Sequence, residues 1–222
     1  MIKPLALFLT ATAAAFIGGP SHAAVTLDFS NTGCTANNSQ NCLIPQTYGD
    51  TANVDVSYRT LNAATGQTTG SGLFAFGSYG DLTDVIYGGA DGLHYIAEIT
   101  LAAMPGQLLS LQSFDVATYN GRASSVPISI YDLAGNLLAG GSYATRSPTH
   151  ATVTPMTGYL SGVVVRWGPD SYNVGLDNIR YDVQPVVPVP EPATWALLIS
   201  GFGGMALAMR RRPMQFSRIR YL

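Results

Sequence analysis

Val54-Asp-Val-Ser-Tyr-Arg59 alternates apolar and polar residues along its whole length. Successive side chains of a β-strand point to opposite faces of a sheet, so this pattern predicts a strand with one buried face. Val25-Thr-Leu-Asp-Phe29 and Val126-Pro-Ile-Ser-Ile-Tyr131 show the same alternation. Further strands are predicted at 93–101, 108–119, 136–144, 152–156, 162–167 and 174–183. This part of the chain is therefore predicted to be all-β.

Turn-forming residues separate these runs. Glycine, proline and asparagine cluster at 62–72, 88–92 and 168–170, and Ala134-Gly135-Asn136 predicts a tight hairpin. Residues 24–184 contain no convincing amphipathic helix and no repeat of fixed period. At about 160 residues they are long enough for one domain with a sizeable core. We predict an antiparallel β-sandwich ectodomain over 24–184.

The charge of this region excludes one class of ligand. Between Ala24 and Val189 the chain has five arginines, no lysine and twelve acidic residues, a net charge of −7. Nucleic-acid binding requires clustered cations to neutralise phosphates, so no nucleic-acid partner is expected. Neutral glycans, or divalent cations held by aspartates, remain compatible with this charge.

The two cysteines, Cys34 and Cys42, enclose a short polar segment. In an exported chain an even number of cysteines at short spacing predicts a disulfide. A redox or metal pair would instead be expected to show a Cys-x-x-Cys spacing or added histidines.

Both termini indicate export. Lys3, the apolar run Leu5–Ile17 and the small-x-small site Ser21-His22-Ala23 predict a signal peptide over residues 1–23, cleaved between Ala23 and Ala24. At the other end, 185–190 form a proline-rich linker, and Ala193 to Met209 carry no ionisable side chain.

That apolar segment predicts a single C-terminal transmembrane helix, since 17 residues are near the lower limit for crossing a bilayer. The cluster Arg210-Arg211-Arg212 would mark its cytoplasmic side, and 213–222 a cytoplasmic tail. The alternative is a buried core helix.

The tail resembles a known family. Pro190-Glu191-Pro192, followed by Trp195-Ala196, an apolar helix and Arg210 to Arg212, is similar to the PEPxxWA variant of the PEP-CTERM sorting signal, here over 190–212. The resemblance implies processing near the Pro-Glu-Pro triplet by an exosortase, a membrane cysteine transpeptidase. It also implies a Gram-negative bacterium that makes extracellular polysaccharide, with the protein at its cell surface, outer envelope or extracellular matrix. The ten residues after the arginines depart from the family pattern.

A second resemblance concerns the sandwich. The first strand, the block Ile99–Gly106 leading to Ser113-Phe114-Asp115, and the closing run Val174–Tyr181 look like jelly-roll domains of the carbohydrate-binding type. The resemblance implies a structural calcium beside the first and last strands, with Asp28 and Asp177 as ligands. The alternative is that Asp177 and Asn178 form a turn held by local side-chain-to-backbone hydrogen bonds.

A catalytic function is not expected. Glycosidases need two carboxylates roughly 5–10 Å apart, and Glu98 would have to pair with Asp115, Asp132 or Asp170. Its alternating context instead predicts a solvent-facing strand position. His94 and His150 are expected to be ordinary surface or edge residues.

Aromatic residues offer a better route to a ligand, because rings stack on sugar faces. The candidates lie in or beside loop-rich stretches: Tyr79, Tyr87, Tyr95, Tyr119, Tyr143, Trp167 and Tyr172. Of these, Trp167 is expected in the core and Tyr172 at a loop tip. The sequence thus predicts a non-enzymatic surface or matrix protein that binds polysaccharide. The alternatives are a structural coat without a ligand and, third, a hydrolase.

Overall fold

The computed structural model describes residues 24–32, 42–70, 72–92, 94–121, 124–145, 148–186 and 193–210. The chain forms two compact units, one ending at Pro185 and the other beginning at Val186. The first unit is a β-sandwich, and the second contains the helix α1 (Ala193–Arg210). The signal peptide predicted for 1–23 and the triplet Pro190-Glu191-Pro192 lie outside the described residues.

The larger sheet has seven strands among the described residues and runs antiparallel throughout. Its order is β10 (Ala151–Val153), β7 (Gln107–Thr118), β12 (Val174–Pro185), β5 (Leu82–Gly88), β4 (Leu73–Tyr79) and β2 (Cys42–Leu43). The short strand β1 (Val25–Leu27) also pairs with β12.

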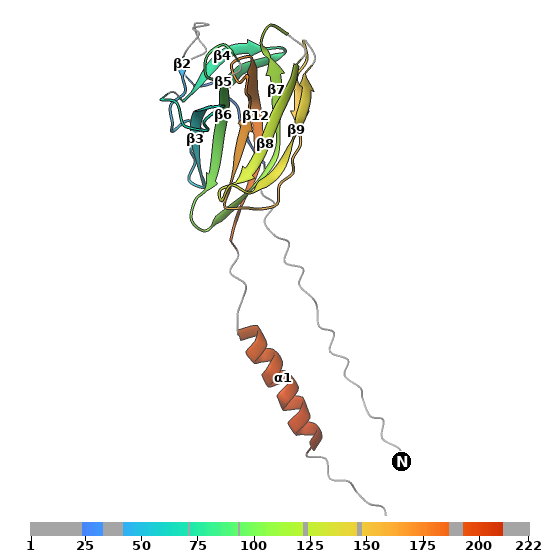
Figure 1. The fold of residues 1–222 in the computed structure, drawn as a ribbon. Coiled ribbons are helices and arrows are strands. Elements are labelled where there is room, and N and C mark those ends of the chain that lie inside the picture. The colour runs from blue at the N-terminus through green and yellow to red at the C-terminus, as the bar shows by residue number, and fades with distance from the viewer. Residues whose placement is uncertain are drawn as a thin grey trace, which may run out of the picture. The chain divides into compact units, whose positions relative to one another are not determined.

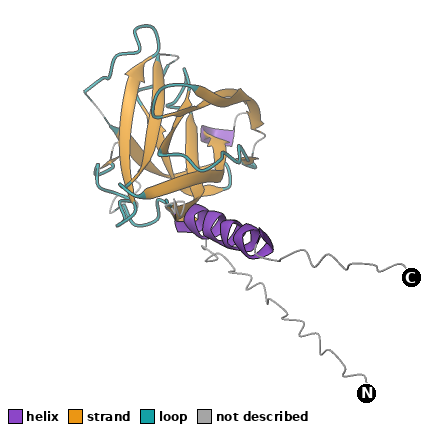
Figure 2. Ribbon diagram, turned by 90° about the horizontal axis from the view of Figure 1, so that it is seen from below, coloured by secondary structure: helices purple, strands orange, loops and turns teal. Residues whose placement is uncertain are grey.

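The second sheet has five antiparallel strands in the part of the chain that the structure describes. Its order is β3 (Val54–Asn62), β6 (Tyr95–Ala103), β11 (Gly162–Trp167), β8 (Ser124–Asp132) and β9 (Leu137–Thr145). Figures 1 and 2 show the two sheets as the two layers of the sandwich.

The core lies between the two sheets, because alternate residues of each strand point inward. On β3 these are Val54, Val56 and Tyr58, all at most 1% exposed. The largest buried side chain, Trp167, donates its indole N–H to the carbonyl oxygen of Val174, with 3.0 Å between nitrogen and oxygen. One hydrophobic cluster draws side chains from both sheets, which confirms the predicted antiparallel β-sandwich.

Most predicted strands are present, but three were missed. β11 has the predicted bounds, and the predicted hairpin at Ala134-Gly135-Asn136 joins β8 to β9 with Gly135 at φ +85°. The missed strands are β2, β4 and β5. β4 places apolar side chains on both faces, since Leu73 and Ala75 join the main core while Phe74 and Phe76 point away from it. Without a polar face the period of two is hidden.

The C-terminal segment is helical as predicted. Within the parts of the chain that the structure describes, no helix is both long and apolar enough to cross a membrane, so the predicted transmembrane span is not confirmed. Cys42 opens β2, and no cysteine among the described residues is free. Because Cys34 lies outside those residues, the Cys34–Cys42 pairing stays a prediction.

Candidate functional site

Strand β12 changes its neighbour partway along its length. Leu176 pairs with Ile86 of β5, whereas Ile179 pairs with Leu27 of β1. Asp177 and Asn178 lie between these two pairings, and Asn178 has a positive φ of 52°. The register of β12 against β7 also shifts here. Among the described residues, the edge of β12 that faces β5 and β1 therefore has no strand partner at Asp177.

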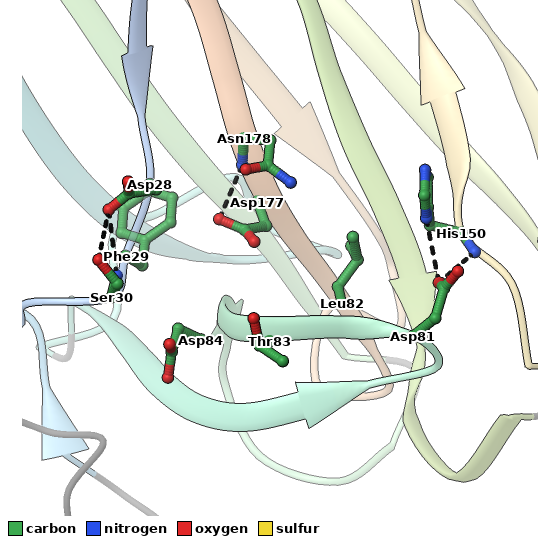
Figure 3. Close-up of a pocket in the computed structure, with 10 residues that line it drawn as sticks. All are labelled: Asp28, Phe29, Ser30, Asp81, Leu82, Thr83, Asp84, His150, Asp177 and Asn178. Atoms are coloured by element: carbon green, nitrogen blue, oxygen red, sulfur yellow. Dashed lines mark hydrogen bonds and ion pairs between the residues drawn. The ribbon is translucent and has the colours of Figure 1, made fainter.

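This opening is a cavity of about 370 Å³ with an acidic lining. Asp28 follows β1, Asp81 lies in the turn between β4 and β5, and Asp84 sits in β5 with a positive φ of 63°. These three aspartates line the cavity together with Asp177 and Asn178, as Figure 3 shows. The structure thus brings together Asp28 and Asp177, which the jelly-roll resemblance had singled out, and adds Asp81 and Asp84 from the β4–β5 hairpin, whose strands were not predicted.

His150 links the cavity to the far side of β12. Its backbone N–H donates to Asp81 Oδ1 over 2.7 Å, and its ring Nδ1 lies 3.0 Å from the same oxygen. The other ring nitrogen, Nε2, is 3.8 Å from Asp115 Oδ1. Asn178 Nδ2 donates to Asp115 Oδ2 over 3.0 Å. His150 is exposed, as expected of a surface or edge residue, and its ring lies between Asp81 and Asp115.

Burial and like charges disfavour the ionised form of two of these carboxyl groups. The pKa of Asp177 is raised to about 6, chiefly because burial removes its carboxylate from water. The nearby carboxylates of Asp28 and Asp115 act in the same direction. Burial also raises the pKa of Asp84, with Asp28 adding to the effect.

As they lie, these side chains do not form a calcium shell. Asp28 Oδ1 accepts the hydroxyl of Ser30 over 2.7 Å, and Asp177 Oδ1 accepts the backbone N–H of Asn178 over 2.7 Å. Among the residues that the structure covers, no three or more Asp, Glu, His or Cys side chains are placed to hold a metal ion. The bond at Asn178 is the local turn bond considered as the alternative. Calcium at Asp28 and Asp177 therefore stays a prediction.

Six aromatic rings form a separate cluster on the outer face of the seven-stranded sheet. The cluster comprises Phe74, Phe76, Tyr79, Tyr87, Tyr119 and Tyr172, with centroids of contacting rings 5.2–6.4 Å apart. We call it the aromatic platform. Tyr79 and Tyr87 are 2% exposed, whereas the other four rings are only partly buried. A Cβ at Gly175 would lie 2.8 Å from the Tyr79 ring, so this ring packs directly on the backbone of β12.

The loop that carries Tyr172 is fixed to its surroundings. Gly88 N–H donates to the carbonyl of Ser171, and Ser171 Oγ donates back to the carbonyl of Gly88 over 2.8 Å. In the same loop Asn173 Nδ2 donates to Asp170 Oδ1 over 3.0 Å and to Asp91 Oδ1 over 3.2 Å. These hydrogen bonds hold planar polar groups close to the ring of Tyr172.

The aromatic residues predicted as ligand candidates divide into two groups. Tyr79, Tyr87, Tyr119 and Tyr172 meet in the platform, while Tyr95, Tyr143 and Trp167 lie elsewhere. Trp167 is in the main core, as expected. Tyr172 does not stand free at a loop tip, because its ring packs edge-on against Tyr87. The sequence reading missed Phe74 and Phe76, although their spacing of two places them on one face of a strand.

The prediction of a solvent-facing Glu98 is wrong. Its side chain is 0% exposed, and its two oxygens accept the Nε–H groups of Arg59 and Arg166, each over 2.6 Å. Alternation correctly places Glu98 on the outer face of its sheet, but the neighbouring arginines cover it. Asp115, Asp132 and Asp170, its suggested partners, make contacts with other residues.

Comparison with known proteins identifies the tail. Residues 188–212 match the PEP-CTERM protein-sorting motif. This motif marks an exported bacterial protein that an exosortase processes at the membrane. The chain thus carries a PEP-CTERM sorting signal. A search of the curated proteins gives no match.

Several solved structures align with the sandwich at low similarity. A carbohydrate-binding module CBM27-1 of Caldicellulosiruptor saccharolyticus, in complex with mannohexaose, aligns with a TM-score of 0.33 and 13% identity, covering 72% of this chain and 97% of that one. A carbohydrate-binding module CBM36 in complex with calcium and xylotriose aligns with a TM-score of 0.27 and 12% identity, covering 56% of this chain and 98% of that one. The GH26-CBM35 mannanase of Podospora anserina aligns with a TM-score of 0.31 and 11% identity, covering 60% of this chain and 28% of the mannanase. At such scores the alignments assign neither a family nor a ligand.

Asp177→Asn tests the charge in the cavity. An unfolded aspartate has a pKa of about 3.9, so between pH 4 and 6 the folded state retains a proton that the unfolded state has lost. Stability of the native chain should therefore fall as pH rises through this window. Asparagine keeps the acceptor for Asn178 N–H. The free energy of unfolding of the variant should therefore equal that of the native protein at pH 4 and exceed it at pH 7 by roughly 1–2 kcal/mol. Urea unfolding between pH 4 and 7 measures this, with the exposed Asp55→Asn as control. Parallel curves for native and Asp177→Asn protein would contradict it.

Calcium at Asp28 and Asp177 is tested by thermal unfolding of the full chain in calcium and in chelator. If both residues bind the ion, the midpoint rises in saturating calcium by roughly 5 °C. Asp28→Asn should abolish the rise and Asp55→Asn should preserve it. Equal midpoints of the native chain in the two buffers would remove calcium from this site.

Proposed function

We propose that this protein is a surface or matrix protein of a polysaccharide-producing Gram-negative bacterium, and that its β-sandwich binds extracellular polysaccharide, as in a biofilm. The PEP-CTERM motif at 188–212 supports the route to the surface. The aromatic platform carries the ligand part of the proposal. Its four partly buried rings offer apolar faces of the kind that stack on sugar rings.

The platform is separate from the main hydrophobic core. The core between the sheets excludes all six of these aromatic rings. Tyr79 and Tyr87 are the buried rings of the platform. Tyr79 donates its hydroxyl to the carbonyl of Tyr172 over 2.6 Å. Because this bond and the Gly88–Ser171 pair fix the loop, a sugar would meet a surface that is already ordered, which lowers the entropy cost of binding.

Polar groups beside the rings suit a neutral glycan. Asp91, Asp170 and Asn173 present carboxylate and amide groups in the same loop region. Sugar hydroxyls both donate and accept hydrogen bonds, so these groups complement the stacking of the rings.

We further propose that the domain is not a catalyst. Glu98 is the one glutamate between Ala24 and Gln184. Both of its oxygens accept hydrogen bonds from arginines, which supports a binding or structural role over a role in proton transfer. Any hydrolytic activity that persists unchanged in Glu98→Gln would discard Glu98 as a catalytic acid or base.

The platform is tested by binding of the full chain to the neutral fraction of the producer's extracellular polysaccharide. Tyr119→Ala and Tyr172→Ala should each weaken binding roughly 3–10-fold, since each removes one stacking ring. Tyr172→Ala leaves the backbone acceptor of Tyr79 in place. The matched control is Tyr159→Ala, which removes an exposed ring outside the platform. Absence of binding would favour a structural coat protein, and equal loss in the control would reject the platform.

Processing is tested by intact mass of the protein from its own cells. We expect a mature form that ends near Pro190 and lacks the segment Trp195–Leu222. Glu191→Ala should increase the unprocessed fraction because it alters the Pro-Glu-Pro triplet, whereas Val186→Ala, outside the matched residues 188–212, should not. A full-length chain as the main surface form would contradict cleavage.

A further inference from the structure

A buried carboxylate lies on the outer face of the five-stranded sheet. Glu98 is in the middle of β6, and its neighbours Ala97 and Ile99 point into the core. Its own side chain therefore points away from the core, yet it is 0% exposed. A charged group with no access to water must be compensated by its neighbours.

Two arginines provide that compensation. Arg59 Nε and Arg166 Nε each lie 2.6 Å from a different oxygen of Glu98, and Arg59 Nη2 also contacts Oε1. Arg166 additionally lies over the ring of Tyr131, with its Cζ 4.9 Å from the ring centroid. Both guanidinium groups are thus held in one orientation by bonds at their Nε side and, for Arg166, by the ring.

The arginines are nevertheless accessible from the outside. The side chain of Arg59 is 50% exposed and that of Arg166 is 39% exposed. The terminal Nη groups of Arg166 make no hydrogen bond or ion pair within the described part of the chain, although the guanidinium group lies over the ring of Tyr131. Donors that are oriented yet accessible are suited to accept an external anion.

The strand register extends this arrangement across the whole sheet. Arg59, Glu98 and Arg166 lie directly opposite one another on β3, β6 and β11, and Ser129 and Gly140 continue the same row on β8 and β9. Five strands at about 4.8 Å spacing make a row roughly 19 Å long. Ser129 and Gly140 add no bulky side chain of their own to the row beyond Arg166.

The charge of the row is opposite to that of the domain. Two guanidinium groups against one carboxylate leave a net charge of +1. The region from Ala24 to Val189 carries −7 overall. Along β3 the next acidic residue is Asp55, four residues from Arg59 and so roughly 13 Å away. The positive charge is therefore local and is not cancelled along that strand.

We propose that this row binds the carboxylate groups of an acidic polysaccharide, a polyuronate, through Arg59 and Arg166. The outward Nη groups donate to the sugar carboxylate, and Glu98 acts as a positioning residue that fixes both guanidinium groups without touching the ligand. The site lies on the sheet opposite to the aromatic platform, so the two sites can be inactivated independently.

The experiment is binding of the full chain to polygalacturonate at fixed ionic strength, with dextran as the neutral polymer. Arg166→Gln should weaken polygalacturonate binding about 10-fold or more, because it removes charge-assisted hydrogen bonds to the carboxylate. Arg166→Lys should restore only part of the affinity, since lysine lacks the planar fork. Raising the salt concentration should weaken binding to the native chain.

The matched control is Arg180→Gln, which removes one exposed arginine from β12 on the other sheet. It should change the affinity less than twofold. A loss equal to that of Arg166→Gln would show general charge attraction and overturn the site. Failure of the native chain to bind polygalacturonate would also overturn it.

A second variant separates binding from folding. Arg59→Met, Glu98→Leu and Arg166→Met together replace the three charged groups by apolar side chains of similar size, a change that folded proteins often tolerate. We expect a cooperative thermal transition and no polygalacturonate binding. If the triple variant does not fold, the decision rests on Arg166→Gln measured well below its own unfolding midpoint, because loss of one partner of the buried Glu98 lowers stability. Retained binding in a folded triple variant would overturn the proposal.

The outcome is distinguishable from that of the aromatic platform. Tyr119→Ala and Tyr172→Ala should leave polygalacturonate binding unchanged, while Arg166→Gln should leave binding of the neutral polysaccharide unchanged. Binding of the producer's neutral polysaccharide without binding of polygalacturonate would reject the arginine row and preserve the platform. Binding of polygalacturonate alone would reject the platform and preserve the arginine row.

Discussion

The pairing of β12 is the constraint on which most of the domain depends. This strand has β7 along one edge, and along the other edge it has first β5 and then β1. Its inward residues Leu176 and Ile179 are completely buried in the core. Its outward Gly175 accommodates the ring of Tyr79. A single strand thus anchors the core on one side and the aromatic platform on the other, and the change of neighbour between them creates the acidic cavity.

The cavity lowers the stability of the folded state, and other interactions of the fold must offset this loss of free energy. A sheet without the irregularity would also have paired Asp177 and Asn178 along the edge of β12 that faces β5 and β1. Instead two residues other than glycine, Asp84 and Asn178, adopt positive φ, and several carboxylates share a partly buried space. Conformations of this kind typically cost about 1–3 kcal/mol each and are most common at functional sites. His150 and Asn178 stabilise two of these carboxylates by hydrogen bonds to Asp81 and Asp115.

Alternation along the chain was sufficient to predict the sandwich, because most strands have one polar face. It failed at β4 and β5 for two physical reasons. Phe74 and Phe76 make the outer face of β4 as apolar as its inner face, and the irregularity at Asp84 changes the phase of β5. These are the strands that build the platform and part of the cavity, so the candidate sites were less predictable than the fold. Asp28 and Asp177 were found only through a resemblance, and their shared cavity depends on a change of strand neighbour that no local pattern encodes.

Glu98 shows a different limit of sequence reasoning. The period of two correctly placed it on the outer face, but exposure depends on partners that are 39 and 68 residues away along the chain. Strand register decides which side chains become neighbours, and register is a property of the whole sheet. Once Arg59 and Arg166 are adjacent, burial of Glu98 follows, because each long side chain gains a charge-assisted hydrogen bond by lying over it. The same register that hides the carboxylate leaves two oriented cations at the surface of an otherwise acidic domain. A negatively charged polymer would be repelled from most of this surface, so such a row would favour binding in one place and one orientation.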